Sequence, residues 1–221
     1  MLNERRRYIT HLEEEGYAPN YDLVDLGLPS GLLWAKCNLG ANKPEKTGLY
    51  FCYRTYTSRD DGLPGVPLED IINNNTDGYK YKSEQGDIAT KYLGDDWTTP
   101  TLAQFTELIN NTTPGTGANE KGWIVNYNDT GVNGCLRKGP NGNEIFFPAT
   151  GDGGSIASRE GVPNYTVTFN LQGFGTYGRY WGANNSGSYY QQLRFSETLL
   201  ISSTYGIRGW FLYNVRAVRT K

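Results

Sequence analysis

Short apolar segments separated by turn residues predict antiparallel strands along much of the chain. Residues 21–26 and 32–39 flank Gly27-Leu-Pro-Ser-Gly31. Pro29 fixes its own φ and Gly31 tolerates a positive φ, so we predict a β-hairpin here. Other short strands are expected at 48–53, 123–127 and 165–171.

A second hairpin is predicted where residues 134–138 and 144–147 flank Asn141-Gly142. That dipeptide suits the mirror-image two-residue turn, whose twist matches the twist of the flanking strands. Between the two hairpins, residues 55–82 are polar and turn-rich. We expect a long loop there, either a second contact surface or an insertion without a role.

Two segments have the pattern of short helices. Asp87 is placed to cap residues 88–93, and Gly94 to end them. Thr101 and Gln104 form a capping box for a second helix. Its apolar stripe is Leu102, Phe105, Leu108 and Ile109.

Residues 1–20 are predicted to form an N-terminal helical arm, because Leu2, Ile9 and Leu12 recur at roughly helical spacing and Gly16 follows them. Three interpretations stay open at this stage. The arm packs on the domain, mediates an oligomer contact, or is a frayed and solvated terminus.

The segment 177–214 has the composition of a contact surface. It holds six tyrosines, two tryptophans and two phenylalanines among serines, glycines and asparagines, without Lys, Asp or His. Tyr and Trp offer large amphipathic contact area while few torsions are frozen. Strand alternation assigns Leu193 and Phe195 to the core and Arg194 and Ser196 to the surface. Trp181 and Phe211 are also expected in the core, whereas the closing strand 215–219 has no clearly apolar side.

Composition and charge argue against some classes of function. The 221 residues carry a formal net charge of −2, which gives no positive field for nucleic acid. No run approaches the length of a membrane-spanning helix, so no membrane insertion is expected. Residues 1–15 lack the apolar region of a secretory signal. We expect one domain over 21–221, on a virion surface or a bacterial cell surface.

The sequence offers few candidate residues for catalysis or metal binding. The single histidine, His11, would have to serve any His-based triad or zinc site alone. Cys37 shares strand parity with apolar neighbours and is interpreted as a small buried hydrophobe. Asp152-Gly-Gly is interpreted as a turn in preference to a calcium loop. We therefore expect no metal and no cofactor.

Several motifs, taken in order, carry a family resemblance. They are 21–41 (YDLVDLGLPSGLLWAKCNLGA), Asp96-Trp-Thr-Thr-Pro-Thr101, 139–143 before Ile145-Phe-Phe-Pro148, Tyr180-Trp181 and Val215-Arg-Ala-Val-Arg219. Together they resemble the Fibrobacter succinogenes major paralogous domain family, which is similar to the formylglycine-generating-enzyme branch of the C-type lectin-like fold. The resemblance covers about residues 21 to 219. Thr98, where the family usually has Arg, and Leu212-Tyr-Asn214, where it usually has Gly-Phe-Ser, depart from the pattern.

The resemblance implies an α+β, C-type lectin-like fold with short antiparallel strands, two helices and long loops. The same branch includes the variable proteins of diversity-generating retroelements, in which adenine-directed mutagenesis rewrites a C-terminal segment. It thus implies a hypervariable ligand-binding surface. The positions that fit such an origin are Asn184, Asn185, Ser186, Ser188, Tyr189, Tyr190, Arg194, Ser196, Ser202, Ser203, Tyr205, Ile207 and Arg208. Gln191, Gln192 and Trp210 do not fit it.

The expected function is binding without catalysis. Formylglycine-generating enzymes use a late pair of cysteines, and no cysteine follows Cys135 here. The implied partner is a protein or glycan receptor on a cell surface. The alternatives are a carbohydrate-active enzyme, whose acid pair would come from loops such as Asp60-Asp61 or Asp95-Asp96, and a structural cell-surface module.

Overall fold

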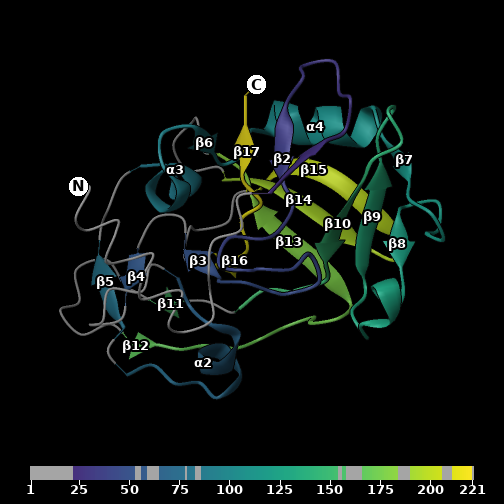
Figure 1. The fold of residues 1–221 in the computed structure, drawn as a ribbon. Coiled ribbons are helices and arrows are strands. Elements are labelled where there is room, and N and C mark those ends of the chain that lie inside the picture. Colours follow the sequence, from purple (N-terminus) through teal and green to yellow (C-terminus); the bar gives the residue numbers. More distant parts are fainter. Residues whose placement is uncertain are drawn as a thin grey trace.

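The computed structural model describes residues 22–52, 56–58, 65–77, 79–82, 86–153, 156–157, 166–183, 190–205 and 211–220. Within these ranges, short strands predominate and there are three α-helices, α2 (Leu68–Ile72), α3 (Ile88–Leu93) and α4 (Leu102–Asn110). The fold is therefore α+β (Figure 1). The arm predicted at 1–20 lies outside the described residues.

One four-stranded antiparallel sheet joins the two ends of the described chain. Its strands, in spatial order, are β1 (Leu23–Asp25), β2 (Leu33–Ala35), β17 (Val218–Arg219) and β6 (Trp97–Thr98). The pairing of β1 with β2 confirms the first predicted hairpin, and Gly31 has the expected positive φ of 70°. β17 lies beside β2 (Figure 1), so the last strand completes a sheet begun by the first.

The second predicted hairpin is also present. It consists of β9 (Gly134–Lys138) and β10 (Glu144–Pro148), with β7 (Thr113–Pro114) and β8 (Trp123–Ile124) beside β9. The predicted turn type is wrong, because only Gly142 (φ 89°), and not Asn141, has a positive φ. Asn141 instead donates from Nδ2 to the Asp25 carbonyl (2.8 Å), so this loop is shaped by its contact with the first hairpin.

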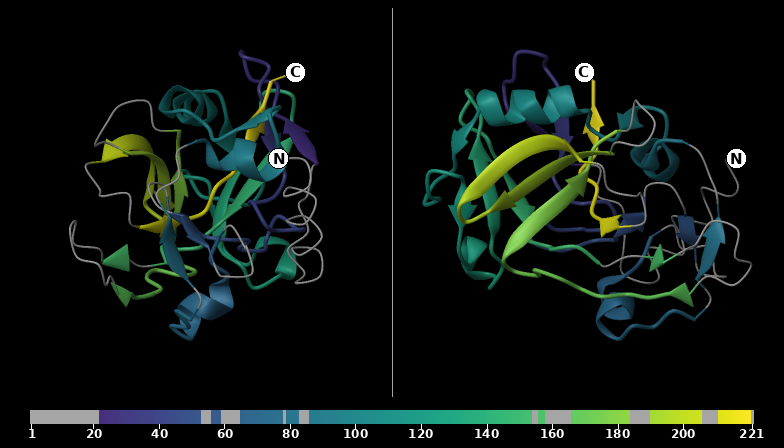
Figure 2. Two further views of the ribbon diagram at one scale, coloured as in Figure 1. Left: turned by 90° about the vertical axis from the view of Figure 1, so that its left-hand side faces the viewer. Right: turned by 180° about the vertical axis from the view of Figure 1, so that it is seen from behind.

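A third sheet contains the long strands of the C-terminal half. β14 (Tyr190–Ser196) lies between β13 (Tyr177–Trp181) and β15 (Leu199–Tyr205), and all pairings are antiparallel. Helix α4 runs along this sheet (Figure 2). The hydroxyls of Thr106 on α4 and Ser202 on β15 are 2.9 Å apart, which fixes the side of the sheet that the helix covers.

Short strand pairs complete the described fold. They are β3 (Phe51–Cys52) with β16 (Leu212–Tyr213), β4 (Tyr56–Ser58) with β5 (Lys80–Lys82), and β11 (Ile156–Ala157) with β12 (Thr166–Val167). The prediction of a long loop over 55–82 is wrong, because this segment holds β4, α2 and β5. Its polar sequence conceals them, since strands and helices this short bury only a few positions each.

Both predicted helices are confirmed with their caps. Asp87 accepts a hydrogen bond from the Thr90 amide (2.9 Å) at the start of α3. At the start of α4, the Thr101 hydroxyl accepts from the Gln104 amide, and the Gln104 side chain accepts from the Thr101 amide. These bonds satisfy amides that have no partner within the helix. A 3₁₀ turn, η1 (Tyr127–Asp129), follows β8 where a longer strand was expected.

Aromatic rings fill the core. One cluster packs Trp34 and Phe105 against Phe147, Tyr180 and Phe195. A second cluster lies on the opposite side of β13 and β14 from the first. It contains Phe51, Trp97, Trp181, Tyr190 and Tyr213. The predicted core positions Trp181, Leu193 and Phe195 are confirmed, with at most 1% of each residue exposed. Phe211 is partly buried against the second cluster.

A buried arginine ties the sheets together. Arg216 is 0% exposed and lies just before β17. Its guanidinium donates to Asn38 Oδ1 (2.8 and 3.0 Å) and to the carbonyls of Lys36 (2.6 Å), Ala35 (3.2 Å) and Phe146 (2.9 Å). The sequence did not decide which side of 215–219 is buried. The side with Arg216 is buried, because its guanidinium is hydrogen-bonded to oxygens of both neighbouring hairpins.

We predict that Arg216→Lys lowers the free energy of unfolding by about 3 kcal/mol or more. An ammonium group cannot reach four oxygens that a planar guanidinium contacts at once. Urea unfolding followed by tryptophan fluorescence measures the change. The matched control is Arg219→Lys on β17, where the side chain is 41% exposed and pairs with Asp96 at 3.3 Å. The control should change stability by less than about 0.5 kcal/mol, and an equal loss in both variants would contradict the role of Arg216.

Candidate functional site

The sheet β13–β14–β15 separates two sets of side chains. Tyr180 on β13 is opposite Leu193 on β14, which is opposite Ser202 on β15. This side packs on α4 and the first aromatic cluster. Because successive side chains alternate in a strand, the intervening residues lie on the other side.

That other side carries a row of polar and apolar groups. Arg179 on β13 is opposite Arg194 on β14, which is opposite Ile201 on β15, and Gln192 is opposite Ser203. We call the surface formed by Arg179, Gln192, Arg194, Ser196, Ile201 and Ser203 the arginine face. Arg194, Ser196 and Ser203 are partly exposed, and Ile201 is 38% exposed. Three of the predicted ligand-binding residues therefore share one partly open sheet surface.

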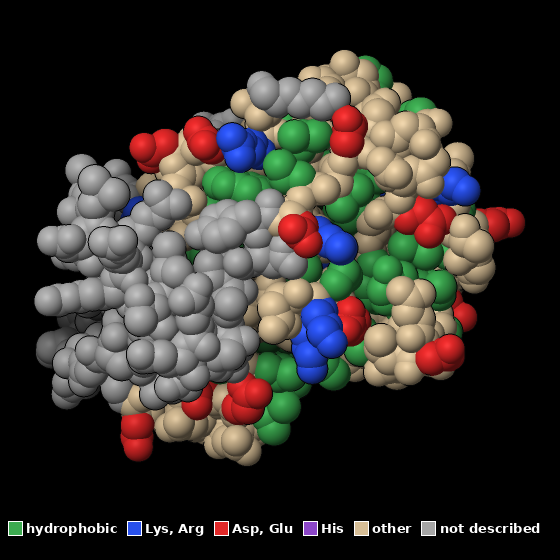
Figure 3. All heavy atoms as spheres, viewed as in Figure 1, with side chains coloured by type: hydrophobic (Ala, Val, Ile, Leu, Met, Phe, Trp, Pro, Cys, Tyr) green, Lys and Arg blue, Asp and Glu red, His purple; other side chains and the backbone are tan. Residues whose placement is uncertain are grey.

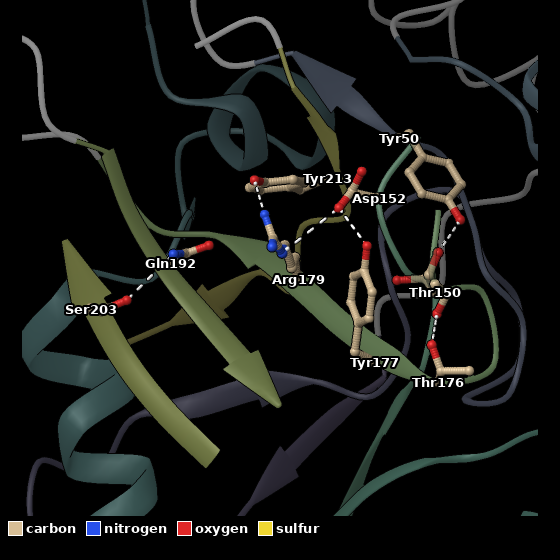
Figure 4. A network of polar contacts seen from close by, with 10 residues as sticks. Tyr50, Thr150, Asp152, Thr176, Tyr177, Arg179, Gln192, Ser203 and Tyr213 are labelled. Carbon is tan, nitrogen blue, oxygen red and sulfur yellow. Dashed lines mark hydrogen bonds and ion pairs between the residues drawn. The ribbon is translucent and has the colours of Figure 1, made fainter. Parts of the chain in front are cut away.

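Arg179 is fixed by a polar network that reaches the scaffold (Figure 4). Its Nη1 donates to the Tyr213 hydroxyl (2.9 Å), and its Nε lies 3.7 Å from Asp152 Oδ2. The Tyr177 hydroxyl donates to the same Asp152 oxygen (2.7 Å). Asp152 is only 4% exposed, and its backbone pairs with Gln172. The carboxylate that the sequence placed in a turn is thus a buried counter-charge.

Burial raises the pKa of both phenols in this network. Burial raises the pKa of Tyr213 to about 12, although the positive charge of Arg179 opposes the shift. Burial and the hydrogen bond to Asp152 both raise the pKa of Tyr177. Both phenols therefore remain protonated near neutral pH and act as hydrogen-bond donors or acceptors. Neither is suited to general-base chemistry, which requires a pKa near the working pH.

Three polar atoms on the arginine face lack hydrogen-bond partners among the described residues, namely Arg179 Nε, Gln192 Oε1 and Arg194 Nε. Arg179 Nε still has the Asp152 carboxylate 3.7 Å away, whereas the other two have no such neighbour among the ion pairs of the described residues. Gln192 is 4% exposed, and its Nε2 lies 3.4 Å from the Ser203 hydroxyl. Gln192 and Ser203 stand apart from the Arg179 network in Figure 4. Unpaired buried polar atoms are uncommon and call for a physical explanation.

Two predicted site residues lie away from the open part of the arginine face. The assignment of Tyr190 to the open surface is wrong, because it is 2% exposed and its ring lies 5.7 Å from that of Trp181. Tyr190 is on the same side of β14 as Arg194, but the second aromatic cluster covers that end of the strand. Ser202 lies on the side facing α4, because it is one residue from Ser203 and strand side chains alternate.

The other predicted positions cannot be placed with their side chains. Tyr205 ends β15, where only its backbone is described. The positions outside the described residues are Asn184, Asn185, Ser186, Ser188, Tyr189, Ile207 and Arg208.

Sequence reasoning missed four residues that shape this site, Asp152, Arg179, Gln192 and Ile201. Adenine-directed change does not account for Gln192, and the sequence gives no other sign that it belongs to the site. The alternation Tyr177, Arg179, Trp181 in β13 was a usable signal for Arg179, since it places all three on one side. The sequence offered no such signal for Asp152, because its contact with Arg179 joins two segments that are distant in the chain.

Comparison of the chain with family models, with curated proteins and with solved structures gave no significant match. The site is therefore interpreted from its own geometry.

The described ranges contain no group of three or more His, Cys, Asp and Glu residues arranged to hold a metal ion. No helix among them combines the length and apolar character needed to cross a membrane. Charged side chains on the face seen in Figure 3 are scattered, with Lys and Arg close to Asp or Glu, so this view shows no extended basic surface.

The cysteines are structural in the described fold. Cys37, Cys52 and Cys135 are all buried, and the burial of Cys37 confirms its interpretation as a small buried hydrophobe. Burial raises the pKa of Cys135 to about 12, so its thiol stays protonated and unreactive.

We predict that Asp152→Asn lowers the free energy of unfolding by about 2 kcal/mol, because the partly buried Arg179 loses its counter-charge. Tyr177→Phe should cost about 1.5 kcal/mol, the value of one hydrogen bond to a charged group. Urea unfolding measures both. The matched control is Asp96→Asn, whose side chain is 73% exposed in its pair with Arg219, and it should be nearly neutral. A neutral Asp152→Asn would show that this network does not hold β13.

Proposed function

We propose that this protein binds a ligand without chemically changing it, on a C-type lectin-like scaffold of the formylglycine-generating-enzyme-like branch. The motifs that carry the family resemblance supply one buried network, which supports this scaffold. Arg216 donates to Asn38, and Asn38 donates to the Tyr180 hydroxyl (3.1 Å). Tyr180 donates to the Pro148 carbonyl (3.0 Å). Four separate motifs thus meet in one interior site.

The observation that carries the binding function is the placement of Arg194, Ser196 and Ser203. They share the partly exposed arginine face, and the strand beneath them is held by fully buried neighbours such as Leu193 and Phe195. A rigid strand that displays exchangeable side chains lowers the entropy cost of binding. Arginine is enriched in binding hot spots, and serine supplies adaptable hydrogen bonds.

Features of the described site favour binding over catalysis. The one carboxylate in the Arg179 network, Asp152, is buried and already paired. The phenols of Tyr177 and Tyr213 have raised pKa values. A glycosidase needs two carboxyl groups placed on either side of the scissile bond. The proposed ligand is a receptor on a cell surface.

Diversification of the C-terminal segment is part of the proposal, and the surrounding DNA tests it. We expect a near-copy of the coding segment for 177–214 beside a reverse-transcriptase gene, with differences confined to adenines of the copy. Codons for Arg194, Ser196 and Ser203 should be among the differing ones. Sequencing the locus makes the measurement. A segment without such a copy, and invariant among sister genes, would contradict diversification and favour a structural module.

A displayed library should separate the binding surface from the scaffold. With Arg194, Ser196 and Ser203 randomised, we predict that most members fold, because partly exposed positions usually change stability by less than about 1 kcal/mol. Surface display after a heat challenge measures folding. The control library randomises Tyr180, Leu193 and Phe195 on the same two strands and should largely fail, since large-to-small changes there cost about 3 kcal/mol or more.

Selection of the first library against a purified folded protein should then yield specific binders. Folding of both libraries to the same extent would contradict the assignment of the two sides of the sheet. A well-folded first library that yields no binders to any of several targets would contradict the binding function itself.

A further inference from the structure

The arginine face carries two arginines, and only one of them has an acidic partner among the described residues. Arg179 and Arg194 are directly opposite each other on adjacent strands. Like charges in this arrangement destabilise a sheet. Asp152 compensates Arg179 at 3.7 Å. Arg194 forms no ion pair with any carboxylate within the described residues, so its charge on this partly buried surface is uncompensated.

Hydrogen bonding at the same place is also incomplete. Arg194 Nε is a buried donor without a partner among the described residues, and Gln192 Oε1 is a buried acceptor in the same condition. Gln192 and Arg194 are two residues apart on one side of β14. Leaving such buried atoms without a hydrogen-bond partner destabilises the surface. A ligand that supplies an anionic acceptor and a nearby N–H donor would recover part of that cost after a small side-chain adjustment.

Apolar surface adjoins this polar pair. Ile201 is directly opposite Arg194 on β15 and is 38% exposed. Arginine is enriched at protein interfaces, and the buried centre of an interface is largely apolar. The rings of Trp181 and Tyr213 on this side are buried and do not offer a flat surface for stacking a sugar.

Resting on the ligand-binding function proposed above, we propose that the arginine face receives an acidic side chain, Asp or Glu, of a protein receptor, and that Arg194 is its ion-pair partner. The planar guanidinium matches a carboxylate through two parallel hydrogen bonds. The main-chain N–H of the acidic residue provides a donor for Gln192 Oε1. Ile201 contacts the aliphatic part of the same receptor segment. Arg179 stays bound to Asp152 and Tyr213 and keeps β13 in place.

The test is an NMR titration of the ¹⁵N-labelled protein at low salt, observing the arginine Nε–Hε signals. The probe is N-acetyl-aspartate N-methylamide, and its neutral control is N-acetyl-asparagine N-methylamide. A third probe is the 2-O-methyl glycoside of N-acetylneuraminic acid, which carries a carboxylate on a sugar. We expect saturable shifts of the Arg194 signal with the aspartate probe in the millimolar range and little change with the asparagine probe.

Variants identify the responsible residue. Arg194→Gln should weaken binding of the aspartate probe about tenfold or more, the loss of a charge-assisted hydrogen bond. Arg194→Lys keeps the charge without the paired geometry and should weaken binding about threefold. Binding to the glutamine variant is followed through backbone amide signals near β14. Arg219→Gln, which removes a positive charge from β17, is the matched control and should leave binding unchanged. Melting temperatures confirm that each variant is folded.

The outcomes separate the possibilities. Equal shifts with the asparagine probe, or unchanged affinity in a folded Arg194→Gln variant, would overturn the proposal. Arg194-dependent binding of the sugar acid alone would overturn the choice of a protein receptor. Absence of aspartate binding, while the displayed library still yields binders, would overturn the acidic-ligand inference and leave the binding function standing. Failure of both experiments would overturn the binding function as well.

Discussion

The fold depends on a buried positive charge that is hydrogen-bonded to neutral oxygens. Within the described residues, the guanidinium of Arg216 is hydrogen-bonded to Asn38 and to backbone carbonyls, and it lies 4.7 Å from the centre of the Phe147 ring. Burial lowers its pKa, but partners on both hairpins stabilise the charged form. A charge without such partners could not remain in the interior. The first hairpin, β10 and the C-terminal segment must therefore meet in one arrangement.

This constraint extends outward through β13. Tyr180 is bonded to Asn38 and Pro148 on one side of the strand, and Arg179 is bonded to Tyr213 and paired with Asp152 on the other. Trp181 adds a hydrogen bond from its indole nitrogen to the Phe51 carbonyl (2.7 Å). Successive residues are thus anchored to different parts of the molecule. β13 in turn fixes the register of β14, which carries Arg194 and Ser196.

A surface supported in this way is suited to exchange of side chains. The energy that specifies the fold lies in the Arg216 network and the aromatic clusters, and little of it depends on Ser196 or Ser203. Side chains such as Ser196 and Ser203 can therefore change without loss of the scaffold. The uncompensated charge of Arg194 is consistent with this division, because a residue selected for a partner need not be balanced within its own chain.

The sequence predicted both hairpins, both capped helices and the inward side of β14, because turn residues, caps and strand alternation act over a few positions. It did not reveal the burial of Tyr190, the turn at Asn141, the helix α2 or the pairing of Arg179 with Asp152. The burial of Tyr190, the turn at Asn141 and the pairing of Arg179 with Asp152 depend on segments distant in the chain, as when Tyr190 packs in one cluster with Phe51 and Tyr213. The tertiary structure alone decided them, since local patterns specify which side of a strand a residue occupies but not what covers that side.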